Sequence, residues 1–219
     1  MDAEWFHNLE VKLPTDGIND RVLRLFPKHA RINLLQARPF VSFTGLELTQ
    51  FAELALNRDW KALELATLIQ IEASYRKNKI QNSISKIFNK HQVKPIHWLA
   101  KARKSIHRIH KRHTINGPAL GSVYFVLLNI NDKYCCYVGQ TQTVKLEGFP
   151  DRQTARIAQH FNGIRHSRHV KRHGLEPLWS LNCFTQRVPA GKVMSAESAF
   201  HDELHLNGIT LRGDGGTRP

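Results

Sequence analysis

The sequence predicts an α+β protein in two parts, a mostly helical domain over residues 1–113 and a small α/β domain over residues 119–219. Three observations support this division. Apolar residues recur at helical spacing through most of the first half. Asn116-Gly117-Pro118 then interrupts the chain. After this break, short runs rich in β-branched and aromatic residues alternate with amphipathic segments, which is typical of a sheet with helices packed on it.

The first part is expected to be built from consecutive helices. Residues 18–36 have a helical pattern that is interrupted at Pro27, because proline removes a backbone hydrogen bond. The run 43–59 is a clearer helix, and Thr44 and Glu47 have the spacing of a capping box at its start. Further helices are expected over residues 59–77, 79–91 and 95–110.

The second part is expected to hold a three-stranded antiparallel sheet flanked by helices. Residues 123–128 and 134–138 predict two strands joined in a hairpin by a polar turn. A helix is expected over residues 153–161, ended by Asn162-Gly163. The remaining expected elements are a third strand over residues 178–188 and a last helix over residues 196–206, capped by Ser195.

Positive charge is concentrated in one segment. The chain has 32 Lys and Arg against 18 Asp and Glu, a net charge of +14, and residues 76–112 alone carry +12 with no carboxylate. Such a stripe attracts polyanions, so nucleic acid is the expected partner, DNA more than RNA. A solvated basic surface, or a segment that docks on the acidic first part, is the alternative. The candidate nucleic-acid contacts are Lys101, Arg103, Lys104, Arg108, Lys111, Arg112, Arg165, Arg168, Lys171 and Arg172.

Cysteine content and hydropathy indicate the compartment. The three cysteines, with Cys135 and Cys136 adjacent, form neither a disulfide framework nor the C-x2-C spacing of a zinc site. No apolar run is long enough to span a bilayer, and the N-terminus lacks the features of a secretory signal. A cytoplasmic or nucleoid-associated protein without a membrane partner is expected.

Five side chains of the second part have the chemistry of a phosphodiesterase. A hairpin can bring Tyr124 and Tyr137 to one face of the sheet, and Arg156 and His160 lie one turn apart on the next helix. Glu197 lies in the first turn of the last helix. Cleavage of a phosphodiester requires a proton acceptor, fixed cations and commonly a metal ion. The alternative is that the tyrosines pack in the core while Arg156 and His160 face solvent.

The order of these residues resembles the GIY-YIG nuclease family. Val123-Tyr124 and Tyr137-Val138-Gly139 lie 13 residues apart from Tyr to Tyr, and Arg156-x3-His160 and a helix with Glu197 follow. Asn207 matches the asparagine that follows the family's glutamate. The resemblance covers about residues 119–216. It implies the family's fold and a divalent-metal-dependent endonuclease that hydrolyses phosphodiester bonds in DNA.

The resemblance also implies a role for each matched residue. Tyr124 would be the general base or would orient the attacking water, and Tyr137 would hydrogen-bond the scissile phosphate or that water. Arg156 would stabilise charge in the transition state. His160 would support Tyr124 or contact phosphate.

The metal site is likewise an implication of the resemblance. Glu197 would bind one Mg²⁺ or Mn²⁺ per active site, since a lone carboxylate with water molecules suits Mg²⁺. No other cofactor is expected. Asn207 would orient the site or the glutamate.

The sequence departs from the family pattern in two ways. Ser122 stands in place of the first motif's glycine, with Gly121 one position earlier, so activity depends on whether this side chain blocks the phosphate. The step of 17 residues from the second motif to Arg156 is longer than in compact members. Arg152, one turn before Arg156, competes for the role of the motif arginine. Arg156 is preferred because only it has His160 one turn later.

An endonuclease with a helical module that binds DNA or a partner is the leading prediction. By analogy alone, a restriction or defence role is favoured over repair or mobile-element roles. A homodimer would suit cleavage of both strands. The alternatives are a non-catalytic nucleic-acid-binding protein that retains the nuclease fold, and a basic scaffold or RNA-binding protein in which the tyrosine pair is a coincidence.

Overall fold

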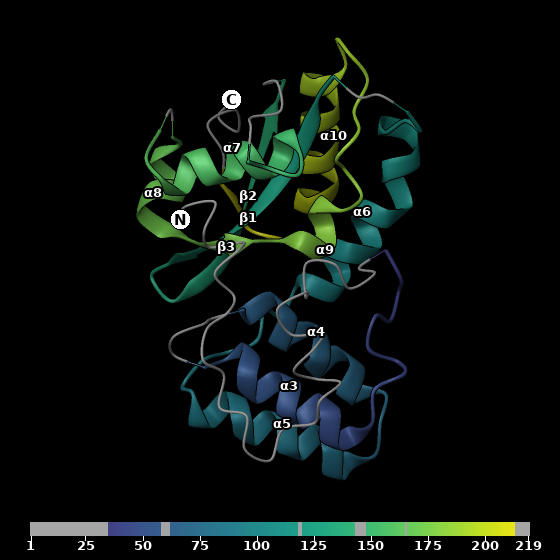
Figure 1. Ribbon diagram of the computed structural model, residues 1–219, viewed down its shortest axis with the longest axis vertical. Helices are drawn as coiled ribbons and strands as arrows, with labels where there is room; N and C mark the ends of the chain where they lie inside the picture. Colours follow the sequence, from purple (N-terminus) through teal and green to yellow (C-terminus); the bar gives the residue numbers. More distant parts are fainter. Residues whose placement is uncertain (1–34, 58–61, 118–119, 143–147, 165, 213–219) are drawn as a thin grey trace. The chain divides into compact units, whose positions relative to one another are not determined.

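The computed structural model describes residues 35–57, 62–117, 120–142, 148–164 and 166–212. These residues form eight α-helices and a four-stranded mixed sheet, so the predicted α+β class is confirmed (Figure 1). The predicted helix interrupted at Pro27 lies almost entirely outside the described residues, as does Arg165. No helix in the described ranges is long and apolar enough to cross a membrane.

The described residues fall into two compact units, residues 35–100 and residues 101–212. The boundary differs from the junction expected near Gly117. The sequence pattern predicts helix α6 (Leu99–His113) in the first domain, but from Lys101 onward its residues belong to the second unit. The reason is tertiary packing, because side chains of α6 contact residues that follow the sheet in the sequence.

The first unit is built from helices α3 (Gly45–Ala55), α4 (Leu63–Ser74) and α5 (Asn78–Lys90). The predicted capping box is confirmed: the Glu47 backbone N–H donates to Thr44 Oγ1 over 3.2 Å, and the Thr44 N–H donates to the Glu47 carboxylate over 2.7 Å. These bonds satisfy backbone donors that the first turn of a helix leaves unpaired. A cluster of three phenylalanines, with ring centroids 5.6–5.7 Å apart, packs at this end of α3: Phe40, Phe43 and Phe51.

The second unit places the sheet between helices. Its strands are β1 (Ser122–Ile130), β2 (Lys133–Thr141), β3 (Gly174–Pro177) and β4 (Leu211–Arg212). Its helices, besides α6, are α7 (Arg152–Phe161), α8 (Arg168–His173), α9 (Trp179–Asn182) and α10 (Val193–Leu206).

The strand order is β3-β1-β2-β4, with β1 antiparallel to β2 and β3, and β2 parallel to β4. The predicted hairpin of β1 and β2 is confirmed. Its turn is formed by Asn131 and Asp132, whose φ angles are 51° and 59°. Two central residues with positive φ are typical of the tight turns that match the twist of a hairpin. The prediction of a purely antiparallel three-stranded sheet is wrong in detail, because β4 adds a parallel strand.

The predicted third strand over residues 178–188 is also wrong. The strand is β3, just before this segment, and the segment itself holds α9 and a loop that pairs Val188 with Gly121. The Asn182 side chain explains the difference. Its Oδ1 accepts from the Phe125 backbone N–H over 2.7 Å, and its Nδ2 donates to the Phe125 carbonyl over 3.1 Å. The amide of Asn182 thus satisfies the backbone N–H and carbonyl of Phe125, which a neighbouring strand would otherwise bond.

The two faces of the sheet are covered by different helices. Tyr124, Val126 and Tyr137 share one face, here called the tyrosine face, because residues in a strand alternate and antiparallel partners lie on the same side. Ile157 of α7 and Val170 of α8 pack against it. The opposite face carries Phe125, whose ring lies 6.1 Å from that of Phe200 on α10. In Figure 1, β1 and β2 pass between α7 and α10.

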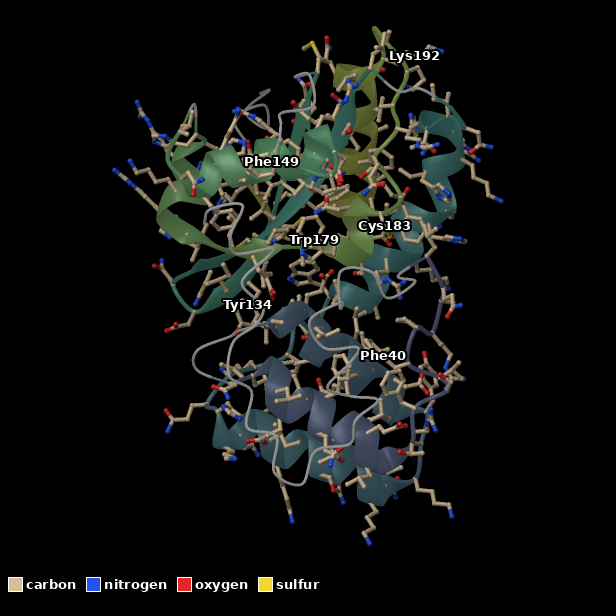
Figure 2. All side chains as sticks on the ribbon, viewed as in Figure 1. Phe40, Tyr134, Phe149, Trp179, Cys183 and Lys192 are labelled. Carbon is tan, nitrogen blue, oxygen red and sulfur yellow. The ribbon has the colours of Figure 1, made fainter. Side chains whose placement is uncertain are left out.

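Helix ends in this unit follow the sequence with one exception. Gly163, with φ of 76°, lies just past α7 as predicted, and Gly208, with φ of 73°, ends α10 in the same way. Ser195 does not cap α10, which begins at Val193. The Ser195 hydroxyl instead donates to the Lys192 carbonyl over 2.9 Å, inside the first turn. Figure 2 shows Lys192 and Tyr134 at opposite ends of this unit, beside the start of α10 and the hairpin turn respectively.

Candidate active site

Tyr124 is the centre of the candidate site. It is the third residue of β1, and only 1% of its surface is exposed. Its phenol oxygen lies 2.6 Å from Nε2 of His160 on α7. A tyrosine buried to this degree needs a hydrogen-bond partner. The expected proximity of Tyr124 and His160 is therefore observed.

The hydrogen bonds of His160 determine which ring nitrogen carries the proton. The backbone N–H of Ser167, at the start of α8, donates to Nδ1 over 2.8 Å. A nitrogen that accepts cannot carry a hydrogen, so the neutral ring holds its hydrogen on Nε2. His160 therefore donates to the Tyr124 oxygen. Burial, followed by the nearby charges of Arg156 and His166, lowers the pKa of His160 from 6.5 to about 4, so the ring is neutral at pH 7.

Tyr137 lies beside this pair on the tyrosine face. Its ring centroid is 6.1 Å from that of Tyr124 and 5.9 Å from that of His160. The side chain is 4% exposed, and it pairs in the sheet with Val126, two residues after Tyr124. The hairpin thus brings both phenols to one face, as predicted.

Arg156 completes the group. It lies one turn before His160 on α7 and is half-buried. Burial raises the pKa of Tyr124 well above its ordinary value, and Tyr137 raises it further, while the guanidinium of Arg156 lowers it by a smaller amount. Arg156 also contributes to the low pKa of His160. Arg152 acts on neither group, so these interactions favour Arg156 in the choice between the two arginines.

Gly139 is required for the packing of Tyr124, a role that its position at the end of the second motif does not reveal. It is the cross-strand partner of Tyr124. A Cβ at this position would lie 2.7 Å from both Cζ and the oxygen of Tyr124, and 2.8 Å from Cε1 of Tyr137. The phenol therefore lies over bare backbone. A hairpin with a two-residue turn at residues 131–132 pairs Tyr124 with Gly139, so the position of the turn in the sequence indicates this contact.

Gln153 positions α7 on the sheet, a role that the sequence did not predict. It is fully buried, and its Nε2 donates to the Val123 carbonyl over 2.6 Å and to the Asn182 carbonyl over 3.2 Å. These bonds tie α7 to the residue before Tyr124. A buried glutamine one turn before Arg156 has no distinctive sequence pattern, so only the tertiary structure reveals it.

Ser122, the departure from the family pattern, has a structural partner. It is fully buried, and its hydroxyl donates to the Gln186 carbonyl over 2.7 Å. The neighbouring Gly121 allows close approach of α10, because a Cβ there would overlap the Val193 side chain. Serine and glycine at these positions thus hold the start of β1 against the loop before α10.

Glu197 is on a different helix from Arg156 and His160. It is half-buried on α10, the helix that packs on the face opposite Tyr124. Val193, one turn earlier, contacts Gly121 at the start of β1. The beginning of α10 is therefore at the same end of the sheet as Tyr124. The structure places Glu197 and the phenols at one end of the sheet but on helices and strands of different faces.

Asn207 does not accompany Glu197. It ends α10, and its amide donates to the backbone carbonyl and the carboxylate of Glu203 over 2.7 and 2.8 Å. It follows Glu197 by ten positions, a distance of about 15 Å along the helix axis. The expected role in orienting the glutamate is thus replaced by a bond to the last turn of the same helix.

The donor set for a metal ion is sparse. Among the described residues, no three His, Cys, Asp or Glu side chains lie close enough to hold an ion. Mg²⁺ is commonly bound through one or two carboxylates, with water and phosphate oxygens completing its shell. The half-buried carboxylate of Glu197 fits that kind of site and does not fit a site made of protein ligands alone.

Most of the predicted nucleic-acid contacts are exposed. On α6 and α8 these are Lys101, Lys104, Arg108, Lys111, Arg112, Arg168, Lys171 and Arg172. Two predicted residues of α6 interact within the unit: half-buried Arg103 donates to the Ser180 carbonyl over 3.5 Å, and Arg108 forms an ion pair with Glu203. Part of the basic stripe therefore docks α6 on its own unit, whereas Lys101, Lys104, Lys111 and Arg112 face solvent.

No family model, curated protein or solved structure matches this chain.

Proposed function

We propose that residues 101–212 form a divalent-metal-dependent endonuclease of the GIY-YIG type that hydrolyses phosphodiester bonds in DNA. The supporting observation is the convergence of Tyr137, Arg156 and His160 on the phenol of Tyr124. A proton acceptor beside a fixed guanidinium is the arrangement that phosphodiester hydrolysis requires. Packing of tyrosines in a core does not by itself require a half-buried arginine and a buried histidine beside the Tyr124 oxygen.

Tyr124 acts as the base in its phenolate form. The attacking water gives its proton to the Tyr124 oxygen, the new P–O bond forms, and the bond to the leaving oxygen breaks as that oxygen takes a proton from solvent. The Nε2–H of His160 donates to the phenolate and stabilises it. Since burial raises the pKa of Tyr124, positive charge at the site is needed to populate this form at neutral pH.

Arg156 and Tyr137 hold the phosphate. The guanidinium is half-buried beside the phenol, where a charged donor stabilises the negative charge that develops on the phosphate oxygens. Tyr137 presents a second phenol on the tyrosine face, where it can hydrogen-bond the same phosphate. Glu197 would bind one Mg²⁺ or Mn²⁺, which supplies positive charge to the phosphate and lowers the pKa of bound water.

DNA binding is assigned to the exposed cations of α6 and α8. Lys101, Lys104 and Lys111 lie three and seven residues apart, which places them along one side of α6. Such a row follows a phosphate backbone without reading its sequence. A restriction or defence role, and a homodimer that cuts both strands, belong to the same proposal.

The test is cleavage of supercoiled plasmid by the purified full chain with Mg²⁺ or Mn²⁺. We expect nicked or linear product, and we expect Glu197→Gln and Tyr124→Phe to abolish it while DNA binding persists. Tyr134→Phe is the matched control, since Tyr134 lies at the hairpin turn on the other face of the sheet. Linear product before complete nicking, with a dimer by sedimentation, would support the homodimer.

Binding without cleavage under all metals would overturn the nuclease and support the second candidate, a non-catalytic nucleic-acid-binding protein. The position of Glu197 on the helix of the opposite face is the observation that favours this candidate. Cleavage that survives Tyr124→Phe at the wild-type rate would contradict the proposed base.

A further inference from the structure

The edge strand β4 adds a cation beside Tyr137. Its two residues pair in parallel with β2, Leu211 next to Cys136 and Arg212 next to Tyr137. Neighbouring residues in adjacent strands lie on the same face of a sheet. Arg212 therefore emerges on the tyrosine face, one strand beyond Tyr137, and Leu211 emerges on the face that α10 covers.

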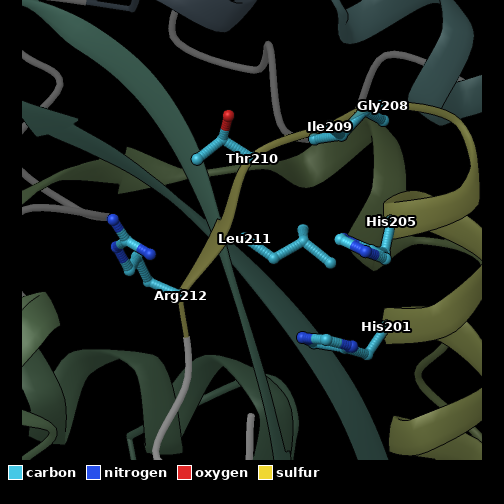
Figure 3. A pocket seen from close by; sticks show the side chains of 7 residues that line it. All are labelled: His201, His205, Gly208, Ile209, Thr210, Leu211 and Arg212. Atoms are coloured by element: carbon cyan, nitrogen blue, oxygen red, sulfur yellow. The ribbon is translucent and has the colours of Figure 1, made fainter. Parts of the chain in front are cut away.

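Two further observations agree with this direction. In Figure 3, Leu211 points towards His201 and His205 of α10, whereas the Arg212 side chain lies on the other side of the β4 backbone. The thiol of Cys135, which belongs to the core of the tyrosine face, is the second observation. Burial raises the pKa of Cys135, and the charge of Arg212 opposes that shift. The guanidinium is thus close to this face.

The charge of Arg212 is available for a ligand. The residue is exposed, and among the described residues no carboxylate forms an ion pair with it. Arg38, Arg76 and Arg108, by contrast, each pair with a glutamate. In the four described strands the only carboxylate is Glu176 of β3, which pairs with Leu127 and so belongs to the opposite face.

We propose that Arg212 binds a phosphate next to the scissile one, so that the substrate strand crosses β2 towards β4. This inference rests on the proposed function, because it takes the scissile phosphate to lie at Tyr124 and Arg156. β4 is the second strand from β1, so at about 4.8 Å per strand Arg212 lies about 10 Å from Tyr124 across the sheet. A phosphate that follows the scissile one along the strand is therefore within reach of a side chain as long as that of arginine. Arginine suits this contact because its planar fork matches two phosphate oxygens.

The test compares three variants of the full chain: Arg212→Ala, Arg212→Lys and Arg187→Ala. Arg187 is exposed on the loop before Val188 and is the matched control. Affinity for a 20-base-pair duplex is measured by fluorescence anisotropy at several salt concentrations, with EDTA present so that no cleavage is needed. We expect Arg212→Ala to reduce the salt slope by about 0.9, which is about eightfold in affinity at 0.1 M salt. Arg212→Lys keeps the slope.

Cleavage kinetics give the second readout. A contact to a neighbouring phosphate contributes to binding alone, so Arg212→Ala should raise KM about as much as it weakens binding and leave kcat unchanged. A fall in kcat at unchanged KM would overturn the proposal, as would a salt slope equal to that of Arg187→Ala. If the wild type binds but never cleaves, while Arg212→Ala still loses the slope, the phosphate contact stands and the nuclease function fails.

Discussion

The Tyr124 oxygen and Nε2 of His160 lie 2.6 Å apart, and the Ser167 backbone N–H occupies the other ring nitrogen of His160. This chain of bonds has one direction. The histidine donates, and it has no vacant nitrogen with which to remove a proton from the phenol. His160 is therefore a positioning residue that stabilises the ionised form of Tyr124 and holds its oxygen in place.

Glutamine should replace His160 better than alanine does. The amide Nε2 of glutamine can donate to Tyr124, whereas alanine removes a hydrogen bond to a charged group, worth about 1.5–3 kcal/mol. We expect His160→Ala to lower kcat by about 10- to 100-fold and His160→Gln to retain most of it. Nitrogen-15 NMR of the wild type should show the hydrogen of His160 on Nε2. A hydrogen on Nδ1 would contradict the assigned direction.

Gly139→Ala should disrupt the site while leaving the rest of the fold. The added methyl group would lie 2.7 Å from the Tyr124 ring, so the phenol must move away from His160. Overpacking of this kind costs about 1–3 kcal/mol of stability. We expect cleavage to fall by more than the loss of folded protein explains, as measured by kcat together with urea unfolding. Wild-type activity with unchanged stability would show that the phenol has room.

The stability of the second unit should fall in mild acid. The pKa of His160 is 6.5 in an unfolded chain and about 4 in the folded protein. Below pH 6.5, therefore, His160 binds a proton in the unfolded state but stays neutral in the folded state until the pH approaches 4. The free energy of unfolding is therefore unaffected by His160 above pH 6.5 and falls as the pH drops towards 4. The total loss has an upper limit of ~3 kcal/mol.

Urea unfolding between pH 4 and 8 tests this dependence. His160→Gln has no group that titrates in this range, so its unfolding free energy should fall less steeply below pH 6.5. Equal pH dependence of the two proteins would mean that other groups cause the acid instability.

The lysines of α6 should determine the salt dependence of DNA binding. Lys101, Lys104 and Lys111 are exposed, whereas Arg103 is bonded to Ser180. Replacing the three lysines with glutamine should lower the salt slope by about 0.9 for each phosphate contact that is lost. The same change at Lys77, the N-cap of α5, and at Lys79 and Lys86 on α5 tests the contribution of the first half of the basic segment. An unchanged slope in the α6 variant would assign DNA binding elsewhere.

Much of the local structure could be predicted because it depends on neighbours in the sequence. The hairpin, the capping box of Thr44 and Glu47, and the glycine-ended helices follow from periodicity and turn chemistry. The third strand could not be predicted this way. Apolar residues in 178–188 alternate like a strand, but the Asn182 amide bonds to β1 and turns the segment into a helix and loop.

By itself, the sequence determined the order of the motif residues, their elements and the clustering of positive charge. Only the tertiary structure decided which of them meet. It brought Tyr124, Tyr137, Arg156 and His160 together, placed Glu197 on the helix of the opposite face, and added Arg212 from an edge strand. The physical reason is that spacing along a helix or strand specifies a direction within that element. Contacts between residues 30 to 90 positions apart depend instead on how buried faces pack.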